Sequence, residues 1–373
     1  METKWFEDIH HIQKISTFEA QTLTLMASDL ITNLVGIFTK DRFEEIQDNQ
    51  LHASDMQIEQ LFNLLREAQA TKWGKTYDFK SIGSYQDFRE RIPVQSAETL
   101  EPHLKQIMDG TTNILWPGVP KRLLSSFNGS SVPITEQALA ESFTQGAYDA
   151  MTIHMHYRQE SRLFSGYFVH IGNETEPSMM DELDDFLKQN EPFILSLLNR
   201  PRFTGLIQLS DNHLRQLIKE MRTEKVSCFH GSIESLRRLL KMAIQEKGRL
   251  PAFITDAEVL FYRTVNTSET IKKSKEGLEL PFRVQCAYCS PEGFIGIQDN
   301  PVDESFLLLL DVSQFYEFRP ADKPNENPIP LEDVTINIDY QLILTTCSGL
   351  WRYLSEGPCL RFVSTKPYRF LLV

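Results

Sequence analysis

Pairs of cysteine and histidine are the first residues whose types could do chemistry. Cys286 and Cys289 have the C-x-x-C spacing of a zinc knuckle or a redox pair, but no second ligand pair follows at a suitable distance. His154 and His156 could face one side of a strand and hold a metal, yet no carboxylate or third histidine lies nearby in the sequence. We therefore expect all four side chains to be packing residues and not metal ligands.

Three further groups carry reactive or charged side chains without a clear chemical role. The segment Ser227-Cys-Phe-His-Gly231 contains a cysteine near a histidine, but nucleophile–base pairs are normally assembled from distant segments. Asp184-Asp185 and Glu44-Glu45 are most simply solvated charges, and His10-His11 is most simply a solvated pair near the N-terminus. None of these groups decides the function.

Longer segments are more informative than these pairs. Three of them occur in the order Ser125-Ser-Phe-Asn-Gly-Ser-Ser-Val-Pro-Ile-Thr135, Tyr288-Cys-Ser-Pro-Glu-Gly-Phe-Ile-Gly-Ile-Gln298 and Thr345-Thr-Cys-Ser-Gly-Leu-Trp-Arg-Tyr353. In this order they resemble the auxin-responsive-promoter family of acyl-acid amido synthetases, a branch of the adenylate-forming superfamily. The segments Trp73-Gly-Lys-Thr-Tyr-Asp-Phe79 and Asp299-Asn-Pro301 resemble the same family, and the resemblance runs from about residue 59 to the end of the chain.

The resemblance implies a two-step reaction in which a carboxylic acid is adenylated by ATP and an amino acid then displaces AMP. It also implies a large N-terminal domain followed by a small mobile C-terminal domain. Glu292 would correspond to the family's Mg²⁺-linked catalytic carboxylate, and Tyr288 to the residue that stacks on adenine. The residues that would correspond to the nucleotide-binding set are Ser125, Ser126, Gly129, Ser130, Ser131, Tyr288, Arg352 and Tyr353.

The chain departs from the family pattern at several of these positions. Phe127 stands where the phosphate loop has its first glycine, and a phosphate cradle needs small residues so that backbone N–H groups can converge on the oxygens. Phe261-Tyr-Arg-Thr264 replaces the His-Gly-Gly strand beside adenine, and Gly357-Pro358 replaces the Gly-Asp whose carboxylate accepts hydrogen bonds from the ribose. The sequence ends at Val373, where the family's hinge and C-terminal domain would begin.

These departures favour a degenerate homologue that is catalytically impaired and acts as a binding or interaction module. An active enzyme that conjugates a carboxylic acid to an amino acid, with ATP and Mg²⁺ as cofactors, is the first alternative. A protein that binds a small carboxylate without nucleotide is the second alternative. In the first hypothesis no cofactor is expected, and the expected partners are a small carboxylic acid or another protein.

The resemblance also supplies the expected fold, an α/β adenylating-domain-like core with mixed sheets flanked by helices and a small terminal β unit. We expect a helical segment over residues 1–55, the core over 56–304 and the β unit over 305–373. The periodicity agrees with this fold, because Ile58, Leu61, Phe62 and Leu65 form one helical face. Further helices are predicted over 86–91, 98–108 and 232–245, and strands over 163–171, 306–310, 315–318 and 341–345.

The composition limits the class of partner and the compartment. The chain has 373 residues and a formal net charge of −13, with basic residues interleaved among acids, so a nucleic-acid partner has no electrostatic support. The apolar stretch over 23–39 contains Asp29 and Asn33 and predicts a packed amphipathic helix in place of a membrane span. Five scattered cysteines and the absence of a secretory signal lead us to expect a cytoplasmic protein.

Overall fold

The structure is a computed structural model that describes residues 39–172, 179–191, 199–200, 211–222, 224–247, 251–300 and 302–373. The helix expected over 23–39 and the pair His10-His11 lie outside these residues, except for the last residue of that helix. No helix within the described ranges is long and apolar enough to span a membrane.

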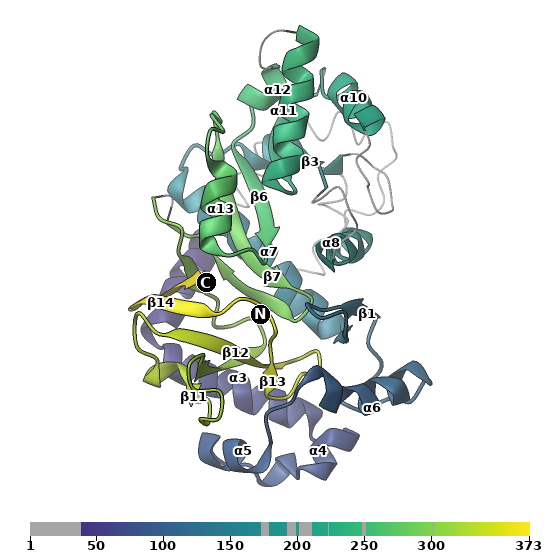
Figure 1. Cartoon of the computed structure of the whole chain (residues 1–373), viewed down its shortest axis with the longest axis vertical. Helices are drawn as coiled ribbons and strands as arrows, with labels where there is room; N and C mark the ends of the chain where they lie inside the picture. Colours follow the sequence, from purple (N-terminus) through teal and green to yellow (C-terminus); the bar gives the residue numbers. More distant parts are fainter. Residues whose placement is uncertain are drawn as a thin grey trace.

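A large mixed sheet forms the centre of the molecule (Figure 1). Its order is β11-β10-β12-β14-β15-β9-β8-β7-β6-β5-β3-β4, with β13 paired to β12. Strands β3 to β7 run parallel to their neighbours, whereas every pairing from β7 through β8 to β11 is antiparallel. The strands are β3 (Tyr167–His170), β4 (Asn199–Arg200), β5 (Val226–His230), β6 (Val259–Thr264), β7 (Arg283–Ser290), β8 (Gly293–Ile297), β9 (Phe306–Leu308), β10 (Gln314–Pro320), β11 (Ile329–Pro330), β12 (Asp339–Thr346), β13 (Tyr353–Leu354), β14 (Leu360–Thr365) and β15 (Tyr368–Leu372).

Helices cover both faces of this sheet, as its largely apolar strands require. One core layer includes side chains from α3, α5, α6, α7 and α8, and the other includes side chains from α10, α11 and α13. The α-helices are α3 (Ala53–Ala68), α4 (Lys72–Thr76), α5 (Tyr85–Arg91), α6 (Ala97–Met108), α7 (Gln145–Tyr157), α8 (Met179–Gln189), α10 (Asp211–Glu220), α11 (Ile233–Lys247), α12 (Ala252–Thr255) and α13 (Ser268–Lys275). A π-helical turn over Ala138–Thr144 leads into α7, and 3₁₀ turns occupy Phe79–Ser81, Leu163–Ser165 and Leu331–Asp333.

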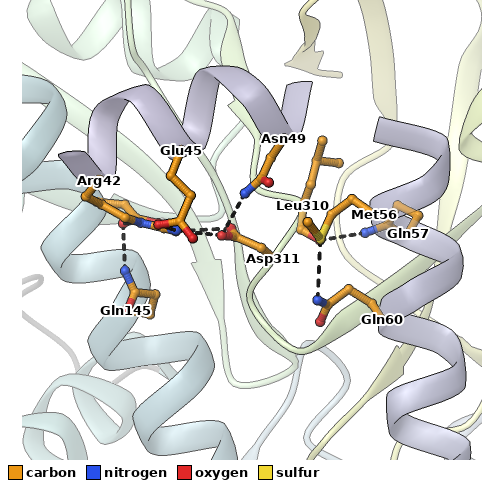
Figure 2. Close-up of polar contacts among 10 residues, drawn as sticks. Arg42, Glu45, Asn49, Met56, Gln57, Gln60, Gln145, Leu310 and Asp311 are labelled. Atoms are coloured by element: carbon orange, nitrogen blue, oxygen red, sulfur yellow. Dashed lines mark hydrogen bonds and ion pairs between the residues drawn. The ribbon is translucent and has the colours of Figure 1, made fainter. Parts of the chain in front are cut away.

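The helix over 39–51 and helix α3 tie the antiparallel part of the sheet to the rest of the fold. Gln57 of α3 donates to the carbonyl of Leu310 (3.0 Å) and accepts from the backbone N–H of Tyr316 (2.9 Å). In the helix over 39–51, Arg42 reaches Asp311 beyond strand β9 (Figure 2). The Gln57 contacts satisfy backbone groups at the sheet, and together with the Arg42–Asp311 pair they fix where the N-terminal helices lie.

Most elements predicted from the sequence are confirmed. The predicted helices correspond to α3, α5, α6 and α11, and three predicted strands correspond to β9, β10 and β12. The strand predicted over 163–171 was too long, because Leu163–Ser165 forms a 3₁₀ turn and only Tyr167–His170 pairs with the sheet. The strands beyond residue 305 continue the large sheet, since β9 pairs with both β8 and β15.

Candidate functional site

The segment that corresponds to a phosphate loop folds as a closed hairpin between β1 (Arg122–Ser125) and β2 (Ser131–Ile134). Ser126 N–H donates to the carbonyl of Ser130 (2.7 Å), and Gly129 N–H donates to the carbonyl of Ser126 (3.0 Å). Gly129 has φ 78°, a conformation that glycine adopts without steric cost. The hairpin tip therefore uses these N–H groups on its own acceptors.

Two further backbone donors of the hairpin are also occupied. Ser130 N–H donates to the side-chain oxygen of Asn128 (2.9 Å). Ser125 N–H donates to the carboxylate of Glu182 from helix α8 (3.1 Å). Ser131, which pairs with Ser125 in the two-stranded register, has an exposed side chain. A negative carboxylate thus already lies beside the hairpin, which disfavours a second anion there.

Glu292 lies in the turn between β7 and β8, where the chain passes close to Gln314. A Cβ at the next residue, Gly293, would lie 2.3 Å from Gln314 Nε2, so only glycine fits there. The Glu292 carboxylate accepts from Ser126 Oγ (2.7 Å) through one oxygen and from Ser355 Oγ through the other. It is only 1% exposed, and burial raises its pKa to about 7, against the opposing effect of the two hydroxyls.

Tyr288 and Phe127 fill the space beside this carboxylate. A Cβ added at Gly357 would lie 2.7 Å from Phe127 Cζ and 2.9 Å from Tyr288 Oη, so both rings pack against the backbone of residue 357. Tyr288 is fully buried, and its hydroxyl has no hydrogen-bond partner among the described residues. Burial raises the pKa of Tyr288 well above its usual value. A ring enclosed in this way has no open face for stacking on a base.

The side chains of Arg352 and Tyr353 lie in different surroundings. Arg352 pairs with the buried carboxylate of Glu317 through two hydrogen bonds of 2.8 Å, and it also donates to the carbonyl of Ile92 (2.6 Å). It therefore fixes helix α5 to the sheet. Tyr353 is buried beside the hairpin; burial raises the pKa of Tyr353 to about 12, while the nearby hydroxyls of Ser130 and Ser126 oppose the rise.

In this structure the residues of the hairpin and of the cluster around Glu292 do not fit a nucleoside triphosphate with Mg²⁺. The backbone N–H groups of Ser125, Ser126, Gly129 and Ser130 already have protein acceptors. Glu292 is enclosed between two serines. The structure brings Ser126, Tyr288, Glu292 and Tyr353 together, whereas Arg352 joins the Glu317 ion pair. Within the described residues, no group of three histidine, cysteine or acidic side chains could hold a metal ion.

Removing the charge of Glu292 gives the first testable prediction. The folded-state pKa is raised from 4.5 to about 7, so the folded state binds more protons than the unfolded state between these values. Wild-type stability should therefore fall by about 3 kcal/mol as pH rises through this window, because a raised acid pKa favours folding at low pH. We expect Glu292→Gln to lose this dependence and to be more stable than wild type near pH 8.

Urea unfolding of both proteins at about pH 5 and about pH 8 measures the difference between their free energies of unfolding. Comparing the two proteins cancels the titration of all other groups. An equal change in stability with pH for Glu292→Gln and wild type would contradict the prediction.

A separate cavity of about 120 Å³ opens between helices α7 and α8 and the parallel part of the sheet. Apolar side chains form most of its wall, and the π-helical turn before α7 contributes Leu139 and Phe143. That turn is held against β8, because Ser142 Oγ accepts from Phe294 N–H (3.1 Å). Short π-helical segments inside α-helices often occur at functional sites.

Polar side chains gather at the sheet side of this cavity. Arg263 of β6 donates from Nε to Asp184 of α8 (2.7 Å) and also from Nη2 to the same carboxylate. His170 of β3 lies 3.8 Å from Asp184, and His230 of β5 stacks on Phe261 with ring centroids 5.3 Å apart. The cavity therefore combines an apolar wall with a buried ion pair and two imidazoles.

The buried ion pair corrects one expectation from the sequence. Asp184 was expected to be a solvated charge, but it is buried because Arg263 approaches from a strand in the middle of the sheet. Arginine inside an otherwise apolar strand was the available signal, since a buried guanidinium requires an anionic partner. His170 was not identified as a site residue, and His230 was considered only as the histidine of the Ser227–Gly231 segment.

The histidine and cysteine pairs have structural explanations. His154 and His156 lie on helix α7 and not on a strand; His154 contacts the carboxylate of Glu258 (3.3 Å), and His156 stacks on Phe43. The strand assumption was wrong because a short apolar segment has no decisive periodicity. Cys286 and Cys289 pack into different core layers on the two faces of β7, so they cannot share a metal.

The cysteine and histidine of β5 are in contact, contrary to the expectation for neighbouring residues. Cys228 Sγ lies 3.7 Å from His230 Nε2, since residues two apart on a strand face the same side. Burial raises the pKa of the Cys228 thiol well above its usual value, and burial lowers the pKa of His230 to about 3. A buried neutral thiol beside a poorly basic imidazole is not an activated nucleophile.

Comparisons with known proteins agree with this architecture. A model of the GH3 family N-terminal domain matches residues 42–201, and a model of the GH3 family central domain matches residues 307–367. A solved acyl acid amido synthetase, AtGH3.15 in complex with 2,4-DB, has a TM-score of 0.68 at 17% identity and covers 90% of this chain and 69% of its own. No curated protein sequence matches the chain.

A second type of solved structure has the same fold. An open conformation of 2-hydroxyisobutyryl-CoA ligase in complex with 2-HIB-AMP and CoA has a TM-score of 0.55 at 15% identity, covering 84% of this chain and 72% of its own. The fold is therefore that of the adenylate-forming ligases. With two family models matching successive parts of the sequence, the chain belongs to the GH3 family, which confirms the resemblance described above.

Proposed function

We propose that this chain is a non-adenylating member of the GH3 family that binds a small molecule in the cavity between α7 and α8. The observation that supports this most directly is the enclosure of Glu292 between Ser126 and Ser355. The enclosure joins the hairpin, the β7–β8 turn and the connection after β13 into one buried cluster. A metal-linked carboxylate needs an oxygen that faces solvent or ligand, and this one is 1% exposed.

The surrounding contacts support the same proposal. Adenylate formation depends on preorganised donors aimed at phosphate oxygens, and loss of one such donor typically lowers the rate by about 10²–10³-fold. Here the N–H groups of Ser126 and Gly129 are bound within the hairpin, and Phe127 packs against residue 357. Several such losses together leave little catalysis even when their effects are only partly additive.

The cavity supports the binding role. It is concave and mostly apolar with a few converging polar groups, which is the usual character of small-molecule sites. This ligand cavity is present in the structure, whereas the hairpin region beside Glu292 is closed. A binding protein needs only a ligand pocket, whereas an adenylating enzyme needs both a ligand pocket and an open phosphate site.

Calorimetric titration of the full chain with ATP and Mg²⁺, followed by pyrophosphate exchange with a panel of carboxylic acids, tests the proposal. We expect no saturable nucleotide binding and no exchange. An active acyl acid amido synthetase of the same fold provides the positive control for both assays. Acid-dependent exchange would overturn the proposal and establish the alternative, an active acid–amino-acid ligase that uses ATP and Mg²⁺.

A further inference from the structure

The floor of the cavity between α7 and α8 is a row of side chains that crosses the parallel strands. The strand register runs from β3 to β7, and the residues of this row, all of which line the cavity, are His170, His230, Phe261 and Gln285. Since neighbouring strands lie about 4.8 Å apart, the row is about 14 Å long. The cavity therefore extends across the strands.

Helix α7 crosses the strands along the same path. The π-helical turn before α7 is held against β8. Farther along the helix, the carbonyl of Ala150 accepts from Gln285 of β7, and the ring of His154 lies edge-on against Phe261 of β6. The side chains of the turn and the helix that line the cavity are Leu139, Phe143, Thr144, Ala147, Ala150 and Met151. At about 1.5 Å per residue they extend over about 18 Å, so the cavity is elongated.

The polar groups around the cavity are bonded to the protein or closed off from the cavity. Gln285 Nε2 donates to the carbonyl of Ala150 (3.0 Å). The other polar atom of Gln285, Oε1, and His170 Nε2 have almost no accessible surface. Arg263 gives both Nε and Nη2 to the carboxylate of Asp184. An occupant therefore meets mainly carbon, and its binding depends on apolar contact area.

The cavity reaches solvent near the end of α8. Lys188 and Glu191 line it there, and both side chains are only half-buried. They carry opposite charges, so this region does not select one sign of charge on a ligand. A polar group of a bound molecule can remain hydrated at this place, which avoids the cost of burying it without a partner.

We propose that the cavity binds one straight aliphatic chain of about eight carbons, whose polar head group remains in solvent beside Lys188 and Glu191. This rests on the proposed binding function and specifies its ligand class. With carbon–carbon bonds of about 1.5 Å, an extended chain of this size is about 10 Å long and fits within the row. The cavity is about 120 Å³. A compact apolar cavity of about 150 Å³ admits benzene in another protein, so a smaller volume spread along a row suits a chain better than a ring.

A series of straight-chain alcohols from 1-pentanol to 1-octanol tests the proposal, because its members share one head group and differ only in CH₂ groups. Calorimetric titration of the full wild-type chain should show the affinity rising about fourfold with each CH₂, which corresponds to about 0.8 kcal/mol per buried CH₂. An affinity that does not rise along the series would overturn the proposal. Failure of 1-octanol to bind up to its solubility limit would overturn it as well.

Benzene is the compact comparison for 1-hexanol, since both molecules contain six carbons. We expect 1-hexanol to bind at least about tenfold more tightly, because a ring needs its full width at one place along the cavity. Equal or tighter binding of benzene would overturn the assignment of a chain but would leave the proposed binding role in place. No probe carries a phosphate, so these results are independent of the nucleotide and pyrophosphate-exchange tests.

A blocking variant tests both the location and the elongated shape. Ala147 lines the cavity and is half-buried on α7, between the parts of the helix that meet β8 and β7. Ala147→Phe should shorten the cavity, so 1-octanol should lose at least about tenfold in affinity while 1-pentanol changes by less than about twofold. Ala140→Phe, at an exposed position of the π-helical turn outside the lining, is the control and should change neither.

The two ways in which the blocking variant could contradict the proposal are distinct. Equal losses for both alcohols in Ala147→Phe would indicate a compact site, and unchanged binding of 1-octanol would place the chain elsewhere; either result overturns the proposal. Urea unfolding verifies that the variant is folded. Ala147→Leu, which introduces a smaller side chain, provides the same comparison where the phenylalanine variant does not fold.

Discussion

Replacing Arg352 with methionine is expected to destabilise the protein by about 3–5 kcal/mol, because it leaves the carboxylate of Glu317 buried without its cation. Both side chains are almost fully buried, and Glu317 receives two hydrogen bonds of 2.8 Å from the guanidinium. The substitution also removes the donor to the carbonyl of Ile92. Tyr85 Oη, which donates to Glu317 (2.9 Å), would remain as a hydrogen-bond partner of the carboxylate but carries no positive charge.

The Arg361–Asp339 pair provides a matched comparison. It is also a bidentate arginine–carboxylate pair, but its two side chains are 41% and 39% exposed. We expect Arg361→Met to cost much less than Arg352→Met, since solvent screens an exposed pair and hydrates the charge left behind. Urea unfolding of the two variants measures both costs under one condition. Equal costs would contradict the view that burial makes Arg352 important.

The stability of Arg352→Met tests the nucleotide-binding role that the family resemblance implies for Arg352. The sequence places it in a segment typical of the family, and the resemblance assigns it to the nucleotide side. In the structure its five-donor head group faces Glu317 and two backbone carbonyls of the α5 region. A large loss of stability in Arg352→Met would support a structural role that is independent of nucleotide.

Individual helices were predictable from the sequence because the hydrophobic pattern of each helix lies within its own residues. The apolar face of Leu61 and Leu65 predicts helix α3, and both side chains are buried in the structure. Gln57 on the same helix was not predicted to be buried. Its partners Leu310 and Tyr316 lie more than 250 residues away in the sequence, with separations of 253 and 259, and no pattern in the helix itself indicates them.

The candidate site likewise contains residues that the sequence identified and residues that only the fold brings together. The sequence identified Ser126, Glu292 and Tyr288 through the family resemblance, and the structure places them together. The second serine of the cluster, Ser355, was missed because its hydroxyl reaches Glu292 only when β13 pairs with β12. The cavity was missed for a related reason, since its wall is assembled from helices α7 and α8, the π-helical turn and five strands that are far apart in the chain.

A second large effect is expected at Arg42, whose guanidinium pairs with the carboxylates of Asp149 and Asp311 and with that of the exposed Glu45. Figure 2 shows its contact with Asp311. Arg42 donates from Nε to Asp149 of helix α7 (2.8 Å) and from Nη1 to Asp311 (2.6 Å). Burial raises the pKa of Asp149, and Arg42 is the nearest cation that opposes this rise. Arg42→Met should cost about 3–5 kcal/mol near neutral pH, because two carboxylates then face each other without a cation.

The pH dependence distinguishes this mechanism from a simple loss of packing. In Arg42→Met the folded-state pKa of Asp149 rises further, so the folded state takes up a proton more readily than the unfolded state. The variant should therefore recover stability relative to wild type as pH falls towards about 5, and Arg42→Met combined with Asp149→Asn should recover part of it near neutral pH. Lys40→Met, which removes an exposed partner of Glu44, is the control and should change stability by less than about 0.5 kcal/mol. A deficit in Arg42→Met that does not change with pH would indicate that methionine fails to fill the space left by arginine, and that charge is not the cause.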